Sequence, residues 1–217
     1  MTESTPRRAR RILLCASGGY QSYALPGFIL SLLRHCADDV RVVLSRAASR
    51  LVSRYAVEVA SRHPVFVEME DTGEEIYVPH IELSRSCELI LVYPATINIL
   101  GKVAQGIADE LISALVLASP APVFFLPVTN PAMWWHPAVQ RNVERLQQDG
   151  YAVLAPLPNI EVATREGLAE VSEPFPFPTL LAQISSVLAG HSAAGAVQRR
   201  ALEPTSQRRA PEPTRKT

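Results

Sequence analysis

The stretch Leu89-Ile90-Leu91-Val92-Tyr93-Pro94-Ala95-Thr96-Ile97-Asn98 decides the fold of this 217-residue chain. Its first five residues are all hydrophobic, which is typical of a parallel strand buried on both faces. A proline and then small and polar residues follow at once, at the position where an open α/β sheet usually holds its ligand. We therefore expect Leu89–Tyr93 to be a central strand that leads directly into part of a binding site.

Short hydrophobic runs of this kind recur along the chain and alternate with segments whose apolar residues have helical spacing. The alternation predicts a Rossmann-like, doubly wound parallel sheet in a flavodoxin-like three-layer α/β fold. The expected strands are 12–16, 40–44, 65–67, 89–93, 123–126 and 151–154. The expected helices are 25–33, 48–61, one starting near 80, 98–107, 109–118, 131–148 and 179–188; Leu51, Val52, Tyr55 and Val59 would form one face of 48–61.

Composition and charge indicate one globular domain with basic ends. Apolar residues make up 47% of the chain and charged residues 19%. We expect a flexible N-terminus at 1–10, a folded domain at 11–190 and a disordered tail at 191–217, although the ends could also touch an acidic partner. Residues 12–190 hold 11 basic and 18 acidic side chains. The folded part therefore does not have the basic face that a nucleic-acid binder needs.

The cysteines and the N-terminus indicate a cytoplasmic protein. Cys15, Cys36 and Cys87 are far apart, and no cysteine or histidine pair has the spacing of a zinc site. We expect reduced thiols and no bound metal. The apolar run 12–16 is too short for a signal sequence or a membrane span, so no membrane partner is expected.

The turn Ser17-Gly18-Gly19 is a candidate phosphate site. Glycines let the backbone approach a phosphate, and the helix that follows offers its N-terminal N–H groups. Residues 17–22 do not form a GxGxxG motif, and no Walker lysine follows. An ordinary tight turn therefore remains an alternative.

Two later stretches place polar groups after strands. In Pro94–Asn98, small residues leave room for a flat heterocycle while Thr96 and Asn98 offer hydrogen bonds; Asn98 could equally be a helix N-cap. Asn130 and Pro131 suit an N-cap and the first helical position. The adjacent residues Trp134 and Trp135 cannot both face the core, so we expect one to face a ligand or a neighbouring subunit.

His80 is a candidate general base, because imidazole titrates near neutral pH. A structural or exposed histidine is the alternative at this position. From the residues alone, both interpretations stay open.

Together these stretches resemble the homo-oligomeric flavin-containing cysteine decarboxylases, most closely the peptidyl-cysteine decarboxylases of lantibiotic-type biosynthesis. The active-site histidine of that family matches His80. Its Pro-Ala-Ser-Ala-Asn-Thr motif falls on 94–99 and keeps Pro94, Ala95 and Asn98, with Thr96 in place of serine; its Pro-x-Met-Asn-x-x-Met-Trp motif keeps Pro127, Asn130, Met133 and Trp134. The run Gly101–Asp109 is also similar to the family, and the resemblance spans about residues 11–160.

The resemblance implies FMN as the cofactor and places it between the subunits of a homotrimer, which we expect to assemble further into a dodecamer. It implies His80 as the base and Asn130 as the ligand of the substrate carboxylate, with Asn98 and Met133 completing the catalytic site. The implied cofactor-binding residues are Ser17, Gly18, Gly19, Ser45, Pro94, Ala95, Thr96 and Asn98.

The implied reaction is oxidative decarboxylation of a cysteine carboxylate to an enethiol, with hydride passing to the flavin. In the family that this chain resembles, bacterial phosphopantothenoylcysteine decarboxylases carry a cysteine late in the sequence, which helps to reduce the enethiol. No cysteine follows Cys87 here. We therefore predict a decarboxylase that acts on the C-terminal cysteine of a ribosomally made precursor peptide and feeds aminovinyl-cysteine ring formation.

The loop 156–178 is long enough to clamp such a peptide. Three alternatives remain within the same fold. They are a phosphopantothenoylcysteine decarboxylase of coenzyme A biosynthesis, a flavin prenyltransferase, and a non-catalytic FMN-binding regulatory subunit.

Overall fold

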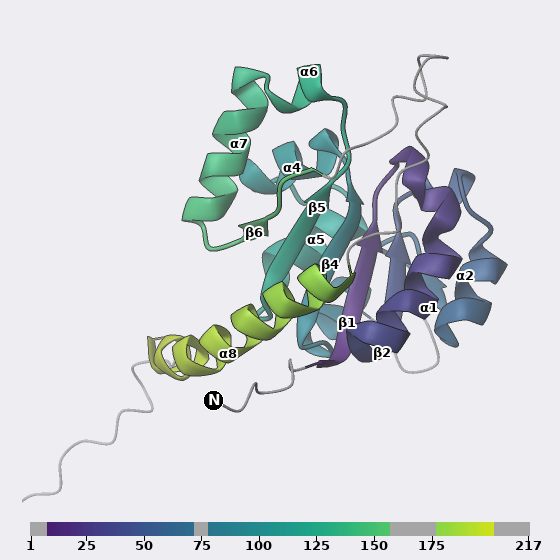
Figure 1. The fold of residues 1–217 in the computed structure, drawn as a ribbon, viewed down its shortest axis with the longest axis horizontal. Helices are drawn as coiled ribbons and strands as arrows, with labels where there is room; N and C mark the ends of the chain where they lie inside the picture. Colours follow the sequence, from purple (N-terminus) through teal and green to yellow (C-terminus); the bar gives the residue numbers. More distant parts are fainter. Residues whose placement is uncertain (1–7, 72–77, 157–176, 202–217) are drawn as a thin grey trace, which may run out of the picture.

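The computed structural model describes residues 8–71, 78–156 and 177–201, and its described strands form a single parallel sheet (Figure 1). The order is β3-β2-β1-β4-β5-β6, and neighbouring strands pair in parallel. This order is that of a Rossmann sheet, so the predicted doubly wound fold is confirmed. The strands are β1 (Ala9–Ala16), β2 (Ala37–Leu44), β3 (Val65–Phe66), β4 (Leu89–Ala95), β5 (Val123–Pro127) and β6 (Ala152–Val153).

Helices cover both faces of the sheet and make three layers (Figure 1). On one face lie α1 (Leu25–His35), α2 (Arg54–Ser61) and α8 (Phe177–Ala201). On the other lie α3 (Pro79–Arg85), α4 (Ile97–Ala104), α5 (Leu111–Ala118) and α7 (Pro137–Gln148). The short elements are the 3-10 helices η1 (Tyr20–Ala24) and η2 (Ala48–Arg50) and the helix α6 (Pro131–Trp134). Within the described residues, no helix is both long and apolar enough to cross a membrane.

The central strand β1 shows why continuous hydrophobic runs mark this sheet. Ile12 and Leu14 belong to the core under α1, α2 and α8, whereas Leu13 and Cys15 belong to the core on the opposite face. All four side chains are fully buried. Because alternate residues of a strand point to opposite faces, a strand covered on both faces needs apolar residues at every position.

The segment 48–61 is not the single helix that its spacing predicts. It divides into η2 and α2, and the Ser53 side chain caps α2 by accepting a hydrogen bond from Ala56 N at 3.4 Å. The break changes the helical phase, so the face counted from Leu51 does not continue. Tyr55 and Val59 are 75% and 60% exposed, and Val57 is buried in their place.

The expected helix 131–148 also divides, because His136 and Pro137 start a new helix. The Nδ1 atom of His136 accepts a hydrogen bond from Ala138 N at 3.2 Å and caps α7. As predicted, the two tryptophans face different ways: Trp134 is buried and Trp135 is 70% exposed. Gly150 has a φ of +91° just after α7, a left-handed conformation that glycine adopts readily at the end of a helix.

Several boundaries differ from the expected ones. Strand β4 continues through Pro94 to Ala95, with a register irregularity against β5 between Val92 and Ala95. Helix α8 runs past the expected end at Leu188 and includes 191–201, which the sequence assigned to the tail. Most of the expected loop 156–178 and the end of the tail lie outside the described residues.

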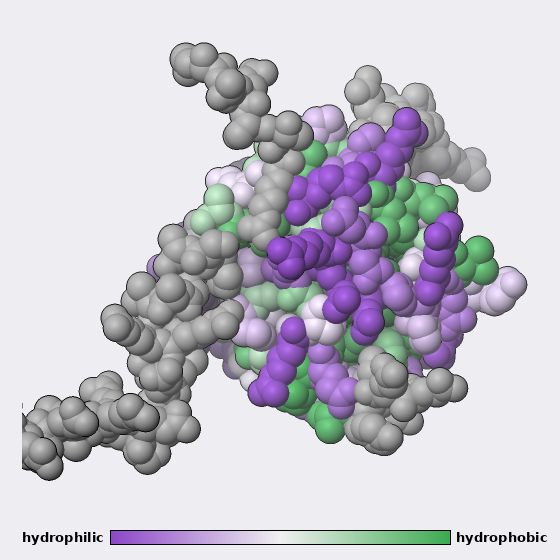
Figure 2. All heavy atoms as spheres, turned by 90° about the horizontal axis from the view of Figure 1, so that it is seen from below, coloured by the Kyte–Doolittle hydropathy of each residue, from purple (hydrophilic) through white to green (hydrophobic). Residues whose placement is uncertain are grey.

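Asp39 joins three segments near the edge where the strands begin. Its Oδ2 atom accepts a hydrogen bond from Arg11 Nε at 3.0 Å, and its Oδ1 atom lies 2.6 Å from His63 Nε2. Arg11 also donates to the Ser86 carbonyl at 2.6 Å. Figure 2 views the molecule from this end and shows a mainly hydrophilic face with smaller hydrophobic patches.

This network predicts a pH-dependent contribution of Asp39 to stability. Burial by itself would raise the pKa of Asp39, but the hydrogen bonds and charges of His63 and Arg11 lower the pKa overall. A carboxyl group with a lowered folded-state pKa stabilises the fold above its unfolded pKa, about 3.9, and this contribution is lost as the pH falls through the folded-state pKa. We therefore expect Asp39→Asn to lower the free energy of unfolding by about 1 kcal/mol at neutral pH and by less below about pH 4.

Urea unfolding of both proteins between acid and neutral pH measures this difference. Asp38→Asn is the matched control, because the Asp38 side chain is 65% exposed and pairs with Arg8 at 3.4 Å. An Asp39→Asn effect that stays constant over the whole pH range would contradict the interpretation.

Candidate active site

A cavity of about 520 Å³ lies at the carboxyl edge of the sheet, beside the point where the strand order reverses between β1 and β4. Its walls are the segments that follow β1, β2, β3 and β4, together with the connection from α4 to α5. This is the position at which open α/β sheets bind their ligands, and the volume is typical of a small-molecule site.

The cavity brings together five of the eight residues that the sequence assigns to the cofactor. They come from three different turns and are Ser17, Gly18, Ser45, Thr96 and Asn98. The other three, Gly19, Pro94 and Ala95, do not line this cavity. Their contact with a cofactor stays a prediction, as it does for the five lining residues.

Ser17 joins the turn after β1 to the turn after β4. Its hydroxyl donates a hydrogen bond to the Pro94 carbonyl at 2.7 Å, and its Oγ atom accepts one from Thr96 N at 2.9 Å. Its Oγ also lies 3.0 Å from Thr96 Oγ1. The backbone adds a bond from Ser17 N to the Pro94 carbonyl at 3.1 Å. Ser17 and Thr96, both predicted cofactor ligands, thus also hold the turn after β1 against the turn after β4.

The two glycines of the first turn are needed because neighbouring turns approach them closely. A Cβ atom at Gly18 would lie 2.4 Å from Ala47 Cβ, and one at Gly19 would lie 2.8 Å from Pro94 Cβ. Real side chains do not tolerate such distances. Gly18 therefore keeps the turns after β1 and β2 together, and Gly19 keeps the turns after β1 and β4 together.

Ser45 starts the second wall in the same way. Its backbone N–H donates to the Ala16 carbonyl at 2.9 Å, and its Oγ atom accepts a hydrogen bond from Ala48 N at 3.1 Å. The side chain is almost fully buried. Ser45 is thus fixed by both β1 and η2, and it lines the cavity from a rigid position.

Asn98 is not the N-cap of its helix, so that prediction is wrong. Helix α4 starts at Ile97, and Thr96 is the capping residue. The helix begins one residue earlier than expected, and because β4 continues to Ala95, only Thr96 lies between the strand and the helix. Asn98 instead lies in the first turn of α4, exposed toward the cavity that it lines.

Charged side chains line the remaining walls, and the sequence patterns did not identify them. Arg46 pairs with Glu68 at 2.7 Å, and Lys102 pairs with Asp109 at 2.9 Å and with Glu110 at 2.8 Å. A signal existed for Lys102 and Asp109, because both belong to the family-like run Gly101–Asp109. The Arg46–Glu68 pair joins different turns and had no local signal.

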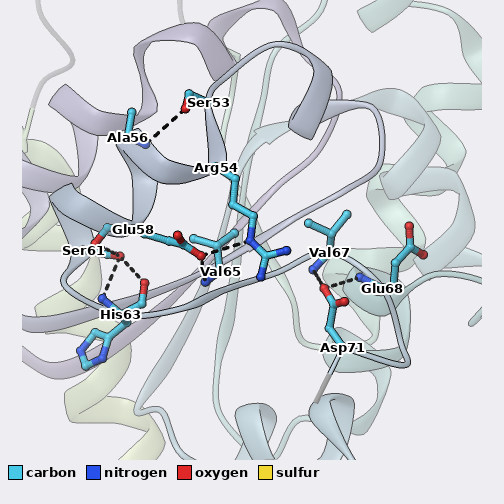
Figure 3. A network of polar contacts seen from close by, with 10 residues as sticks. All are labelled: Ser53, Arg54, Ala56, Glu58, Ser61, His63, Val65, Val67, Glu68 and Asp71. Atoms are coloured by element: carbon cyan, nitrogen blue, oxygen red, sulfur yellow. Dashed lines mark hydrogen bonds and ion pairs between the residues drawn. The ribbon is translucent and has the colours of Figure 1, made fainter. Parts of the chain in front are cut away.

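The third wall is held in place by the contacts around β3 (Figure 3). Before the strand, Glu58 Oε1 accepts hydrogen bonds from Val65 N at 3.2 Å and from Arg54 Nε at 3.1 Å. After it, Asp71 Oδ2 accepts from Val67 N at 2.7 Å and from Glu68 N at 3.1 Å. These carboxylates fix a strand of only two residues, so Glu68 faces the cavity from a defined backbone.

The remaining predicted catalytic residues do not line this cavity. His80 lies in the first turn of α3 and is half-buried; within the described residues its buried Nδ1 atom has no hydrogen-bond partner. Asn130 caps α6 as expected, because its Oδ1 atom accepts a hydrogen bond from Met133 N at 2.8 Å. Met133 itself is 50% exposed. Helices α3 and α6 both start at the carboxyl edge of the sheet, on the same side as the cavity.

The close contact at Gly18 predicts the effect of adding one methyl group. Gly18→Ala should push the turns after β1 and β2 apart, and we expect it to lower the free energy of unfolding by about 1–3 kcal/mol. Gly27→Ala is the matched control: no atom lies within 4 Å of a Cβ at Gly27, and alanine is favoured in helix α1. Thermal unfolding should show Gly18→Ala destabilised and Gly27→Ala unchanged or slightly stabilised. Equal melting temperatures would contradict the close packing of the two turns.

Comparison with known proteins identifies the family of the chain. Residues 1–176 match the family model described as Flavoprotein. The coenzyme A biosynthesis bifunctional protein CoaBC of Bacillus subtilis (strain 168) is 36% identical over 165 residues, which are 76% of this chain and 40% of that protein. The chain thus spans about two fifths of the length of this curated relative.

The solved structures with a similar fold include two decarboxylases. The FMN-dependent cysteine decarboxylase SpaF is 28% identical with a TM-score of 0.67, and the match covers 84% of this chain and 97% of SpaF. A PPC decarboxylase complexed with pantothenoylaminoethenethiol is 25% identical with a TM-score of 0.62, and the match covers 72% of this chain and 87% of that protein.

These matches confirm the resemblance to flavin-dependent cysteine decarboxylases and the expectation of a flavin cofactor. They do not confirm the lantibiotic-type subclass, because the curated relative is a protein of coenzyme A biosynthesis. With a family match over residues 1–176, a doubly wound sheet and a cavity at its switch point, the chain belongs to the Flavoprotein family.

Proposed function

We propose that the chain is an FMN-dependent enzyme that oxidatively decarboxylates a cysteine carboxylate to an enethiol. The main observation behind this proposal is the cavity at the switch point between β1 and β4, lined by Ser17, Ser45, Thr96 and Asn98. The likeness to SpaF and to a PPC decarboxylase supports the same reaction class.

The cavity fits FMN in size and in the chemistry of its walls. Its volume of about 520 Å³ lies in the usual range for cofactor sites. The hydroxyl and amide groups of Ser17, Ser45, Thr96 and Asn98 can hydrogen-bond a polar ligand, and Gly18 brings backbone into the wall. When bound, FMN supplies the hydride acceptor for the oxidation of cysteine.

His80 is the proposed base. The oxidation removes a hydride from the thiol-bearing carbon and a proton from the thiol, so a thioaldehyde forms. Carbon dioxide then leaves, and its bonding electrons pass through the new C=S group to give the enethiol after protonation. The Nδ1 atom of His80 is buried and has no hydrogen-bond partner within the described residues. This supports the proposal, because the atom is free to exchange a proton with a bound substrate.

Asn130 and Met133 are proposed to bind the substrate. The Oδ1 atom of Asn130 is used by the helix cap, and its amide NH₂ group can donate to the substrate carboxylate. Moving the substrate carboxylate from water into the protein without such a hydrogen-bond partner would cost a large free energy. The half-exposed side chain of Met133 offers an apolar contact one turn away.

A homotrimer, assembled further into a dodecamer, is the proposed particle. His80, Asn130 and Met133 lie outside the cavity that one chain forms. The family resemblance implies FMN between subunits, so a neighbouring chain would complete the site. The exposed indole of Trp135 is available for such a contact.

Two substrates of the same chemistry each have support. Phosphopantothenoylcysteine is supported by the relative CoaBC and by the PPC decarboxylase, at least as well as the peptide is by SpaF. A peptide with a C-terminal cysteine is supported by the absence of any cysteine after Cys87 in this sequence, because the enethiol would then not be reduced. We propose both as candidates and expect one to dominate.

A direct comparison of the two substrates tests the proposal. Purified protein with FMN is incubated with phosphopantothenoylcysteine or with a peptide that ends in cysteine, and product masses are measured. We expect a loss of about 46 Da, the mass of carbon dioxide and two hydrogens, because the reaction stops at the enethiol. A loss of about 44 Da would indicate that the enethiol is reduced. His80→Asn should abolish the loss, whereas His35→Asn, at the exposed end of α1, should not. An unchanged mass for both substrates would contradict the proposed reaction.

Asn130→Asp separates the structural role of Asn130 from its role in binding. Aspartate is an equally good N-cap, so we expect the melting temperature to stay nearly unchanged. The new charge would repel the substrate carboxylate, and we expect kcat/KM to fall by about 100-fold, in line with the loss of a charge-assisted hydrogen bond. Asn142→Asp, on α7, is the matched control and should keep full activity. Full activity in Asn130→Asp would remove Asn130 from the proposed site.

A further inference from the structure

Lys102 lines the proposed cofactor cavity from the same face of α4 as Asn98. The two residues are four positions apart in the helix and are therefore neighbours on its surface. The Lys102 side chain is 21% exposed, so most of it is shielded from water.

The ammonium group of Lys102 holds the connection between α4 and α5. Its Nζ atom lies 2.9 Å from Asp109 Oδ1 and 2.8 Å from Glu110 Oε1, and both carboxylates line the cavity. The carbonyl of Lys102 also accepts a hydrogen bond from Ile107 N at 2.9 Å. One residue thus fixes the connection with its main chain and with its side chain.

Lys102 offsets part of the negative charge of this wall. Without it, two adjacent carboxylates would face the cavity and would repel an anionic ligand. Arg46, the other cation among the described lining residues, is paired with Glu68 at 2.7 Å. The hydrogen bond to Glu110 and the charges of both carboxylates raise the pKa of Lys102, so it stays protonated at neutral pH.

We infer that Lys102 is a positioning residue of the cofactor cavity: it holds the α4–α5 connection as a wall and offsets one of the two carboxylate charges there, which favours binding of an anionic cofactor. This inference rests on the proposed FMN function. It assigns Lys102 no step in the decarboxylation.

The test compares a charged and an uncharged flavin. Protein freed of flavin is titrated with FMN and with riboflavin, and dissociation constants are measured by flavin fluorescence. For Lys102→Gln we expect FMN affinity to fall by about tenfold and riboflavin affinity by about twofold or less, since only FMN carries the phosphate charge. The FMN effect should shrink in about 0.5 M salt. Lys102→Arg should restore FMN binding.

Matched variants separate this role from plain structural damage. Arg10→Gln removes the same charge from the exposed pair with Glu88, at the start of β1 and away from the cavity, and should leave both affinities unchanged. The double variant Asp109→Asn/Glu110→Gln keeps Lys102 and should bind FMN more tightly than the wild type. This second variant also decides the matter if Lys102→Gln does not fold.

Three outcomes would each overturn the inference alone. They are an equal loss of FMN and riboflavin affinity in Lys102→Gln, and FMN affinity that is unchanged in Lys102→Gln or not increased in the double variant. A wild-type protein that binds neither flavin would overturn the proposed function as well.

Discussion

The site depends on the hydroxyl group of Ser17. It donates to the Pro94 carbonyl at 2.7 Å and accepts from Thr96 N at 2.9 Å, across the point where the strand order reverses. The pairing of β1 with β4 ends at Cys15 and Val92, and the contacts of Ser17 continue the link beyond it, where the two segments turn away from the sheet. The close contacts at Gly18 and Gly19 add the turn after β2. Three turns are thereby fixed as one surface, and α4 begins from it with Asn98 and Lys102 facing the cavity.

The sequence predicted the sheet well because both faces of each central strand are buried. A run such as 89–93 is hydrophobic at every position, as a strand between two layers of helices must be. Helix breaks were less predictable. Ser53 and His136 each start a new helix by accepting a backbone hydrogen bond, and apolar spacing does not record such local caps. For this reason the buried face of α2 contains Val57 rather than Tyr55.

The neutral part of the site could be predicted from motifs, whereas the Arg46–Glu68 pair could not. Ser17, Thr96 and Asn98 each follow a strand, so sequence position alone brings them to one edge. Arg46 and Glu68 meet only because β2 and β3 are neighbours in the sheet. The motifs also point to a reaction class rather than a substrate, since the cavity is formed by groups that we propose to contact a cofactor. Specificity would then depend on residues outside it, such as Met133 and Trp135, which are exposed in the single chain.

The most direct measurement of the central claim is a crystal structure of the purified protein with its flavin. We predict FMN in the cavity between Ser17, Thr96 and Lys102, with its phosphate at the turn that follows β1. We also predict that His80 of a neighbouring subunit approaches the flavin ring. Flavin bound elsewhere on the sheet, or protein that crystallises without flavin when FMN is supplied in excess, would contradict the account.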